Sequence, residues 1–202
     1  MTYSDLLLYA MGSAILVITP GPVVVAIVAR AASRGVRSSV PLALGVSFGD
    51  IVWPIAAVLG LAALVHTFEG AMTVLRYGGA LVLIWMGISL WRSSGKVEAQ
   101  AGLDESGWAG FFAGLGVIFG NPKAVIYYLG VLPAIFDIDT LSLADLAIIC
   151  AVSAVVPFIG NMVWAVAAAR ARRLLKSDTG TRRLDQISGA ALVGVGVVIA
   201  AT

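Results

Sequence analysis

The sequence predicts an all-α membrane protein with six transmembrane helices, arranged as two inverted three-helix repeats whose first and fourth helices are broken. Three observations lead to this fold class: the composition, six long apolar segments, and a proline break that recurs once in each half. Of the 202 residues, 60% are hydrophobic and 12% are charged, whereas a soluble domain has roughly 45–50% apolar and about 25% charged residues. So little polar surface predicts a chain buried in lipid, organised as one domain over residues 1–202.

Each expected helix is an apolar stretch close to the length that crosses a bilayer, about 20 residues. The six segments are 5–29, 40–64, 74–91, 108–132, 142–168 and 184–201. None of them alternates apolar and polar residues as the strands of a membrane barrel must. We therefore expect a helical bundle, with halves of about 1–91 and 108–202.

The basic residues predict the orientation of the chain. Eleven of the 13 lysines and arginines lie in alternate connections between the expected helices: Arg30, Arg34, Arg37, Arg92, Lys96, Arg170, Arg172, Arg173, Lys176, Arg182 and Arg183. Cytoplasmic loops collect such residues, so both termini are expected to be periplasmic. Contact with lipid headgroups explains the basic cluster before the last helix better than nucleic acid does, and no nucleic-acid partner is expected.

Two breaks interrupt the apolar segments, "TPGP" (Thr19–Pro22) in the first and "GNPK" (Gly120–Lys123) in the fourth. Other helix-breaking or small residues repeat in the same order. The matched pairs are Pro20/Pro122, Pro54/Pro157 and Gly79/Gly189, with offsets of 102, 103 and 110 residues. Each pair joins a helix to the third helix after it, so the second half is expected to run inverted relative to the first. Transporters built from inverted repeats place such broken helices at a binding site near the middle of the membrane.

The chemistry of the breaks predicts a site for a zwitterion. Pro20 and Pro22 lack a backbone N–H, Gly21 permits unusual dihedral angles, and Asn121 and Pro122 interrupt the fourth helix. The freed polar groups must face protein, water or a ligand, because hydrocarbon offers them no partner. The N-terminus of a half-helix suits a carboxylate, and freed carbonyls with an acidic side chain suit an ammonium group. A free amino acid carries both groups.

Two charged residues strengthen this prediction. Asp50, in the second segment, and Lys123, in the fourth, are the Asp, Glu, Lys or Arg residues that lie deep in expected helices. A charge at that depth costs about 3 kcal/mol or more and indicates a functional role. We expect Lys123 to bind a carboxylate, and Asp50 to bind the amino group or to carry a coupling proton. The alternative is an ion pair between Asp50 and Lys123 that only holds the bundle together.

The remaining candidates are polar residues near the breaks. Asn161, close to the kink expected at Pro157, is more often an interhelical hydrogen-bond partner than a ligand. Of the adjacent Tyr127 and Tyr128, we expect one to reach the site and the other to pack, and Tyr127 is the candidate. The candidate substrate-binding residues are therefore Thr19, Pro20, Gly21, Pro22, Asp50, Asn121, Pro122, Lys123, Tyr127 and Asn161. With one cysteine and no metalloprotease, phosphate-loop or dinucleotide motif, no cofactor and no metal site are expected.

A membrane hydrolase is the rival from another functional class. "GVSFG" (residues 45–49) matches the G-x-S-x-G pattern around a serine nucleophile, Ser47. The pattern lies in an apolar helix, and the single histidine, His66, is about 28 Å further along it at 1.5 Å per residue. A serine–lysine dyad with Lys123 is the remaining form of this alternative. Transport is favoured, and no catalytic residue is expected.

Long stretches of the chain also resemble the LysE/RhtB family of bacterial amino-acid exporters. The resemblance lies in "TPGPVVVAIVARAASRGVRSSVPLALGVSFGDIVWPIAAVLGLAAL" (residues 19–64), "LRYGGALVLIWMGISLWR" (75–92) and "GFFAGLGVIFGNPKAVIYYLGVLPAIF" (110–136). The order and spacing of T-P-G-P, G-x-x-x-G-D and N-P-K make the match specific. One departure is the short connection 93–107, which puts a regulatory role for it in doubt.

The resemblance implies a secondary active exporter of small amino acids or derivatives in the bacterial inner membrane. It implies coupling to a proton or cation gradient and contact with membrane lipids, and it is compatible with a homo-oligomer. It does not fix the substrate, because family members handle basic, neutral and branched amino acids. A second buried acid is missing, so a neutral substrate is favoured over a basic one. Export of an inorganic cation is the alternative within transport, but it requires a cluster of acids where only Asp50 is available.

Overall fold

The structure is a computed structural model that describes residues 1–59, 77–78, 80–81, 83–85, 87–88, 91–92, 107–173 and 178–201. All regular elements of these residues are helical, as the composition predicted. Of the expected third helix, 74–91, the structure describes 77–78, 80–81, 83–85, 87–88 and 91, which are helical, whereas Gly79 and His66 lie outside the described residues.

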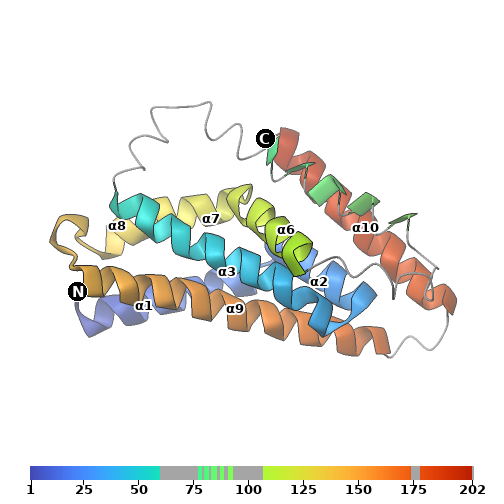
Figure 1. The fold of residues 1–202 in the computed structure, drawn as a ribbon, viewed down its shortest axis with the longest axis horizontal. Coiled ribbons are helices and arrows are strands. Elements are labelled where there is room, and N and C mark those ends of the chain that lie inside the picture. Colours follow the sequence, from blue (N-terminus) through green and yellow to red (C-terminus); the bar gives the residue numbers. More distant parts are fainter. Residues whose placement is uncertain are drawn as a thin grey trace.

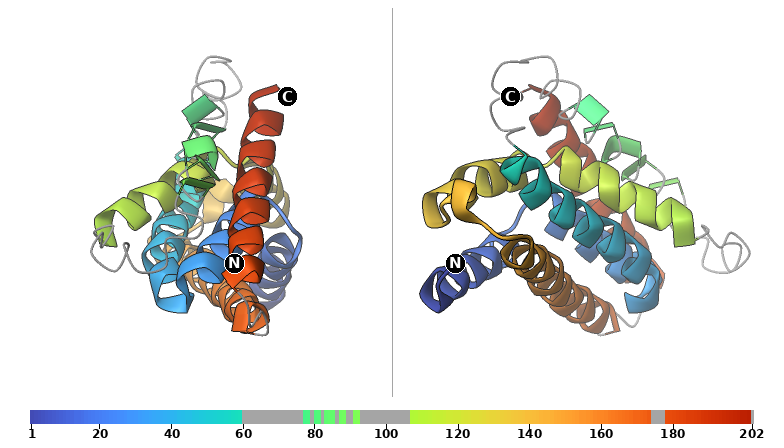
Figure 2. Two further views of the ribbon diagram at one scale, coloured as in Figure 1. Left: turned by 90° about the vertical axis from the view of Figure 1, so that its right-hand side faces the viewer. Right: turned by 60° about the vertical axis from the view of Figure 1, so that its left-hand side comes forward.

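Helices α3 (Val36–Val58) and α9 (Leu143–Arg173) lie side by side along the long axis of the molecule, whereas α10 (Asp178–Ala201) runs obliquely to them (Figure 1). In chain order the helices are α1 (Tyr3–Ile18), α2 (Pro22–Arg34), α3 (Val36–Val58), α6 (Gly107–Phe119), α7 (Pro122–Ile126), the π-helix η1 (Tyr127–Val131), α8 (Leu132–Ile135), the 3-10 helix η2 (Ile138–Thr140), α9 (Leu143–Arg173) and α10 (Asp178–Ala201). Helix α3 packs against both α6 and α9, and α2 packs against α9 and α10. The end views show α10 at the edge of this bundle (Figure 2).

Both predicted breaks are present. Helices α1 and α2 meet at 56°, and α6 meets the α7–α8 segment at 59°. Among the described residues, α3 and α9 are long and apolar enough to cross a membrane, and up to four spans result if each bent pair counts as one. The apolar part of α10, Gln186–Ala201, is shorter. The arrangement of six spans as two inverted repeats stays a prediction.

The helix ends correct the expected first loop. Helix α2 continues to Arg34 and α3 begins at Val36, so Gly35 alone separates them. Arg30, Arg34 and Arg37 therefore lie on helices rather than in a loop. The segment "ARAASR" is rich in alanine and arginine, which favour helix, and Gly35 turns the chain at a φ of 85° that other residues rarely adopt.

Close contact between α3 and α6 depends on glycine. A Cβ on Gly45 would meet the carbonyl oxygen of Phe111, and a Cβ on Gly114 would meet the carbonyl oxygen of Leu42. The backbones of the two helices therefore touch directly at this crossing. This contact holds the fourth segment, and with it the second break, against the helix that carries Asp50.

A hydrogen-bonded layer of side chains connects α1, η1 and α9. The Tyr9 hydroxyl lies 2.7 Å from the Ser153 hydroxyl, and the Tyr127 hydroxyl donates to the Tyr9 carbonyl at 2.8 Å and lies 2.9 Å from the Ser13 hydroxyl. The Tyr9 and Tyr127 rings stack at 5.8 Å. Tyr127 belongs to the π-helix, a wider turn that the sequence analysis did not predict. Pro133 lies two residues after the π-helix. It has no N–H to donate to a helical hydrogen bond, and its ring displaces the preceding turn.

Candidate binding site at the two helix breaks

A cavity of about 30 Å³ lies where the two breaks meet. By this measure it has room for roughly two waters. Its walls come from α1, α2, α3, α6, α7 and α9, and its lining residues are Leu16, Val17, Thr19, Gly21, Val23, Val24, Val46, Asp50, Ile118, Asn121, Lys123, Ala124, Pro157 and Asn161. One acid, one base and two amides thus share a cavity that is otherwise lined mainly by apolar side chains.

Six of the ten residues predicted from the sequence line this cavity: Thr19, Gly21, Asp50, Asn121, Lys123 and Asn161. Pro20, Pro22 and Pro122 lie beside it and shape the backbone, and Tyr127 lies in the hydrogen-bonded layer instead. The sequence did not predict the valines at the start of α2, Val46 on α3, or Pro157 as wall residues. Apolar residues at these positions carry no signal that separates a cavity wall from core.

Lys123 binds the broken end of α1. Its ammonium donates to the carbonyl oxygens of Leu16 at 2.6 Å and of Thr19 at 2.8 Å. The Leu16 carbonyl is available because its helical donor would be the N–H of Pro20, which does not exist. A lysine ammonium has three N–H groups, and the third has no bond among the described residues. Lys123 therefore joins the two breaks and retains one donor for a ligand.

Trp164 of α9 binds the same helix end. Its indole N–H donates to the carbonyl oxygen of Val17 at 3.1 Å. Gly160, one turn earlier on α9, allows this contact, because a Cβ there would overlap the Val17 side chain. Trp164 was not among the candidate residues predicted from the sequence. The available signal was that an indole N–H inside an apolar helix needs an acceptor, and the break in α1 supplies free carbonyls.

Asp50 is buried with the Tyr128 hydroxyl as its polar neighbour. It is 1% exposed, and neither carboxylate oxygen has a hydrogen-bond partner among the described residues. The expected alternative of an Asp50–Lys123 ion pair is not formed, since the lysine binds backbone carbonyls. Pro54 also cannot donate to the Asp50 carbonyl one turn before it. The side chain of Asp50 therefore offers oxygen atoms without hydrogen-bond partners at the cavity wall.

Asn161 is likewise buried and unsatisfied. It is 1% exposed, and both its amide nitrogen and its amide oxygen lack partners within the described ranges. The interhelical hydrogen bond considered from the sequence is not present there. Buried amides are nearly always paired, so water or a ligand in the cavity is the partner that this side chain requires.

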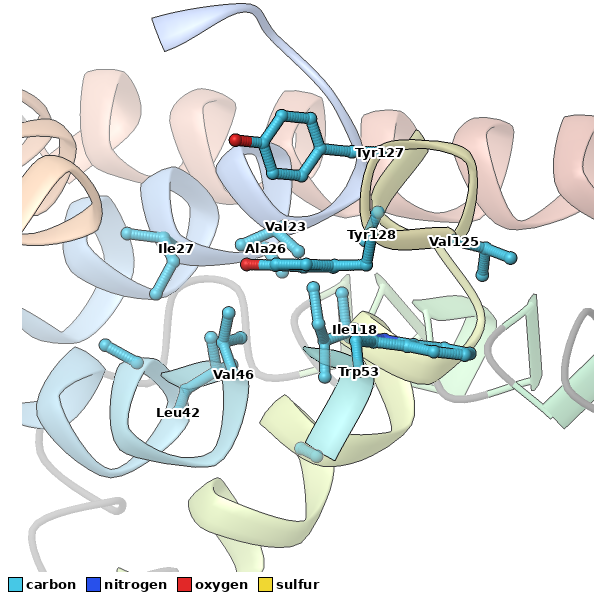
Figure 3. Close-up of a cluster of buried hydrophobic side chains, with 14 of the residues drawn as sticks. Val23, Ala26, Ile27, Leu42, Val46, Trp53, Ile118, Val125, Tyr127 and Tyr128 are labelled. Atoms are coloured by element: carbon cyan, nitrogen blue, oxygen red, sulfur yellow. The ribbon is translucent and has the colours of Figure 1, made fainter. Parts of the chain in front are cut away.

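Tyr128, rather than Tyr127, is the tyrosine near Asp50. Its ring extends from η1 among residues of α2 and α3, as Figure 3 shows. Its hydroxyl is fully buried, interacts electrostatically with Asp50, and has no hydrogen-bond partner in the part of the chain that the structure describes. Adjacent residues point about 100° apart on a helix, so one of the two tyrosines faces α3 and the other does not. Both lie in the π-helix, and its wider turn sets which of them faces α3.

The start of α2 presents free backbone donors to the cavity. Gly21 is its N-cap and makes no side-chain cap, and Pro22 occupies the first turn. Val23 and Val24 line the cavity, and the first N–H groups of a helix lack partners within it. Gly21 is extended, with a φ of −164°, so the unusual dihedral expected there is not used. Its missing side chain instead leaves the helix end open.

The geometry does not assemble the alternative hydrolase. Ser47 does not line the cavity, and its hydroxyl has no hydrogen-bond partner among the described residues. Lys123, the base of the considered dyad, is bound to α1. In the same residues, no three His, Cys, Asp or Glu side chains gather as metal ligands.

Comparison with known proteins identifies the family. The LysE type translocator model matches residues 14–202. An uncharacterized membrane protein of Synechocystis sp. is 30% identical over 98% of this chain and 97% of its own. The threonine efflux protein of Escherichia coli K12 is 28% identical over 93% of both chains. The leucine efflux protein of Enterobacter sp. is 32% identical over 65% of this chain and 63% of its own.

No solved structure matches the chain. The family match covers both helix breaks and every residue of the cavity. This chain belongs to the LysE type translocator family of membrane proteins.

Proposed function

We propose that this protein is a secondary active exporter of small amino acids across the bacterial inner membrane, driven by a proton or cation gradient. The observation that carries the proposal is the cavity in which Lys123 and the unpaired Asp50 are brought together without pairing with each other. The efflux proteins similar to this chain are named for the amino acids threonine and leucine.

The carboxylate of the substrate binds between Lys123 and the start of α2. The ammonium of Lys123 has one N–H to offer, and the N–H groups of Val23 and Val24 stand at the positive end of the α2 dipole. Because Gly21 supplies no side-chain cap, nothing in that cap competes with the ligand. Two independent positive features thus face one side of the cavity.

The amino group binds on the side of α3. The Asp50 carboxylate accepts hydrogen bonds from an ammonium, which offsets the cost of burying its charge. A proton satisfies the same carboxylate when no substrate is present. Alternation between these two occupants links export of an amino acid to entry of a proton, since one carboxylate does not hold both.

Uptake into proteoliposomes tests the proposal. Labelled amino acids are offered under an imposed pH gradient to wild type, Asp50→Asn and Lys123→Ala, with Arg172→Ala, at the far end of α9, as the control. We expect gradient-driven uptake by wild type and the control, and its loss in both site variants. Full activity of both site variants would reject the site. Transport of an inorganic cation without any amino acid would reject the substrate class.

A further inference from the structure

We infer that the hydrogen-bonded layer between α1, η1 and α9 is a gate, which closes the cavity toward the end of the bundle that we expect to be periplasmic and opens to release the substrate. The layer consists of Tyr9 and Ser13 of α1, Tyr127 of η1 and Ser153 of α9. The inference rests on the proposed function and deepens it, because it names the barrier that an exported solute must pass after leaving the cavity.

The first step is the position of the layer along the helices. On α1, Tyr9 and Ser13 come before the cavity wall at Leu16. On α9, Ser153 comes before the cavity wall at Pro157. The η1 residue of the layer follows the part of the wall that α7 supplies. The beginning of α1, the beginning of α9 and the helix η2 lie at one end of the bundle (Figure 1), so all three elements place the layer between the cavity and that end.

The second step is the packing of the layer. Its four side chains are all buried. The rings of Tyr9 and Tyr127 stack, and the Phe136 ring packs against Tyr9 at a centroid distance of 5.4 Å. Gly12 lets Tyr127 approach α1, since a Cβ there would lie 3.0 Å from the tyrosine hydroxyl oxygen. An amino acid passes such a layer only when the two tyrosine rings separate.

The third step is that side-chain hydrogen bonds join the elements of the layer. The Tyr127 hydroxyl bonds to the Tyr9 carbonyl and to the Ser13 hydroxyl. The Tyr9 hydroxyl bonds to the hydroxyl of Ser153. A hydrogen bond between neutral groups shifts an equilibrium by only about two- to tenfold. The layer can therefore open without the unfolding of any helix.

The fourth step identifies the element that moves, which is the segment α7–η1–α8. Pro122 begins this segment, Pro133 lies near its end, and its middle, Tyr127–Val131, is a π-helix. Helices bend at prolines and at π-turns, because the regular hydrogen bonds are interrupted there. A change in this bend carries Tyr127 away from α1.

Tyr128 connects the gate to the ionisable site. Its hydroxyl is the polar neighbour of Asp50, and its ring meets the Tyr127 ring edge-on at 5.1 Å. A proton or an ammonium group at Asp50 gives the carboxylate a new partner, which changes what Tyr128 contacts. Exchange of these occupants therefore reaches the layer through one side chain, as coupling through contiguous contacts requires.

Cysteine accessibility tests the gate. Cys150→Ser removes the native cysteine, and Val24→Cys places a reporter thiol in the cavity wall. A small membrane-impermeant thiosulfonate is applied from the expected periplasmic side, in cells with a permeabilised outer membrane, and from the cytoplasmic side, in inverted vesicles. Tyr127→Phe keeps the ring but removes two hydrogen bonds of the closed layer, so labelling from the periplasmic side should become about tenfold faster. Labelling from the cytoplasmic side should not increase.

Two further variants complete the design. Ser153→Ala removes the partner of the Tyr9 hydroxyl and should accelerate labelling from the same side. Tyr3→Phe makes the same chemical change as Tyr127→Phe at a position on α1 that is 81% exposed, and it should leave the labelling rate unchanged.

The outcomes separate the gate from the proposed function. A labelling rate that does not change in Tyr127→Phe would overturn the gate. So would a rise from both sides, which indicates general loosening of the bundle, or a rise from the cytoplasmic side alone. Uptake of labelled amino acids is measured in proteoliposomes with the Cys150→Ser protein. Acceleration from the periplasmic side without any amino-acid transport would support the gate and reject the substrate class of the proposed function.

Discussion

The two ionisable residues of the cavity, Lys123 and Asp50, are expected to affect the stability of the fold differently when they are replaced. Lys123 bonds to two backbone carbonyls, so Lys123→Ala leaves at least the Leu16 carbonyl unpaired, at a cost of about 1–3 kcal/mol. Asp50 makes no ion pair and has the Tyr128 hydroxyl as its polar neighbour among the described residues, so Asp50→Asn replaces a buried acid by a neutral amide and should leave the thermal midpoint unchanged or raised. Both variants should lose transport. Thermal unfolding in detergent, measured on the preparations used for uptake, checks the contrast.

The thermal midpoints of Asp50→Asn and Lys123→Ala can each contradict the role given to the replaced residue. A large fall in the midpoint of Asp50→Asn would show that the carboxylate has a structural partner, and the site would then be an ion pair or network. Equal midpoints for Lys123→Ala and wild type would show that its bonds to α1 contribute nothing to the fold.

At the scale of one element, the broken end of α1 is held from two sides, by Lys123 of α7 and by Trp164 of α9. Trp164→Phe removes the indole N–H and keeps an aromatic ring, so the Val17 carbonyl loses its 3.1 Å partner. We expect a loss of about 1–3 kcal/mol of stability and a change in the maximum rate of transport larger than the change in substrate affinity. Trp108→Phe, at a site 69% exposed, is the control. Equal effects of the two substitutions would contradict a role in holding α1.

The crossing of α3 and α6 gives a second prediction at this scale. In Gly114→Ala the new methyl group meets the backbone of Leu42, and backbone cannot move aside as a flexible side chain does. We expect a loss of about 1–3 kcal/mol or more. Gly194→Ala, on α10 with open space around it, should be neutral or stabilising, since alanine favours helix. Thermal unfolding of the two variants distinguishes helix contact from a general effect of losing glycine.

Local chemistry explains why the sequence predicted the helix breaks and the two ionisable residues of the cavity, Asp50 and Lys123. Proline and glycine interrupt a helix wherever they occur, and a charge in an apolar segment is costly in any fold, so neither inference required knowledge of packing. The partner of Lys123 could not be predicted, because the Leu16 carbonyl reaches it only through the 56° bend between α1 and α2. The choice between Tyr127 and Tyr128 depended on a π-turn that shifts the helical register.

At the scale of the whole molecule, the basic residues and the bundle predict one orientation in the membrane. The first residue of α1 and the helix η2 lie near one end of the bundle, and the junction of α2 and α3 lies toward the other (Figure 1). Arg30, Arg34 and Arg37 surround that junction, which by the distribution of basic residues faces the cytoplasm. Tyr3 and Thr140 should then both be periplasmic. The two predicted helices that lie between the two broken segments must both cross the membrane for the chain to return to that side.

Cysteine labelling tests that orientation and the count of spans together. Cys150→Ser removes the native cysteine, and single cysteines are then placed at Tyr3, Arg37 and Thr140, which are exposed. A membrane-impermeant maleimide added to cells with a permeabilised outer membrane should label the first and third positions, and Arg37→Cys only after the inner membrane is opened. The reverse pattern would invert the orientation and keep the fold. Labelling of Tyr3 and Thr140 from opposite sides would require an odd number of crossings between them, and the two halves could not then be inverted three-helix repeats.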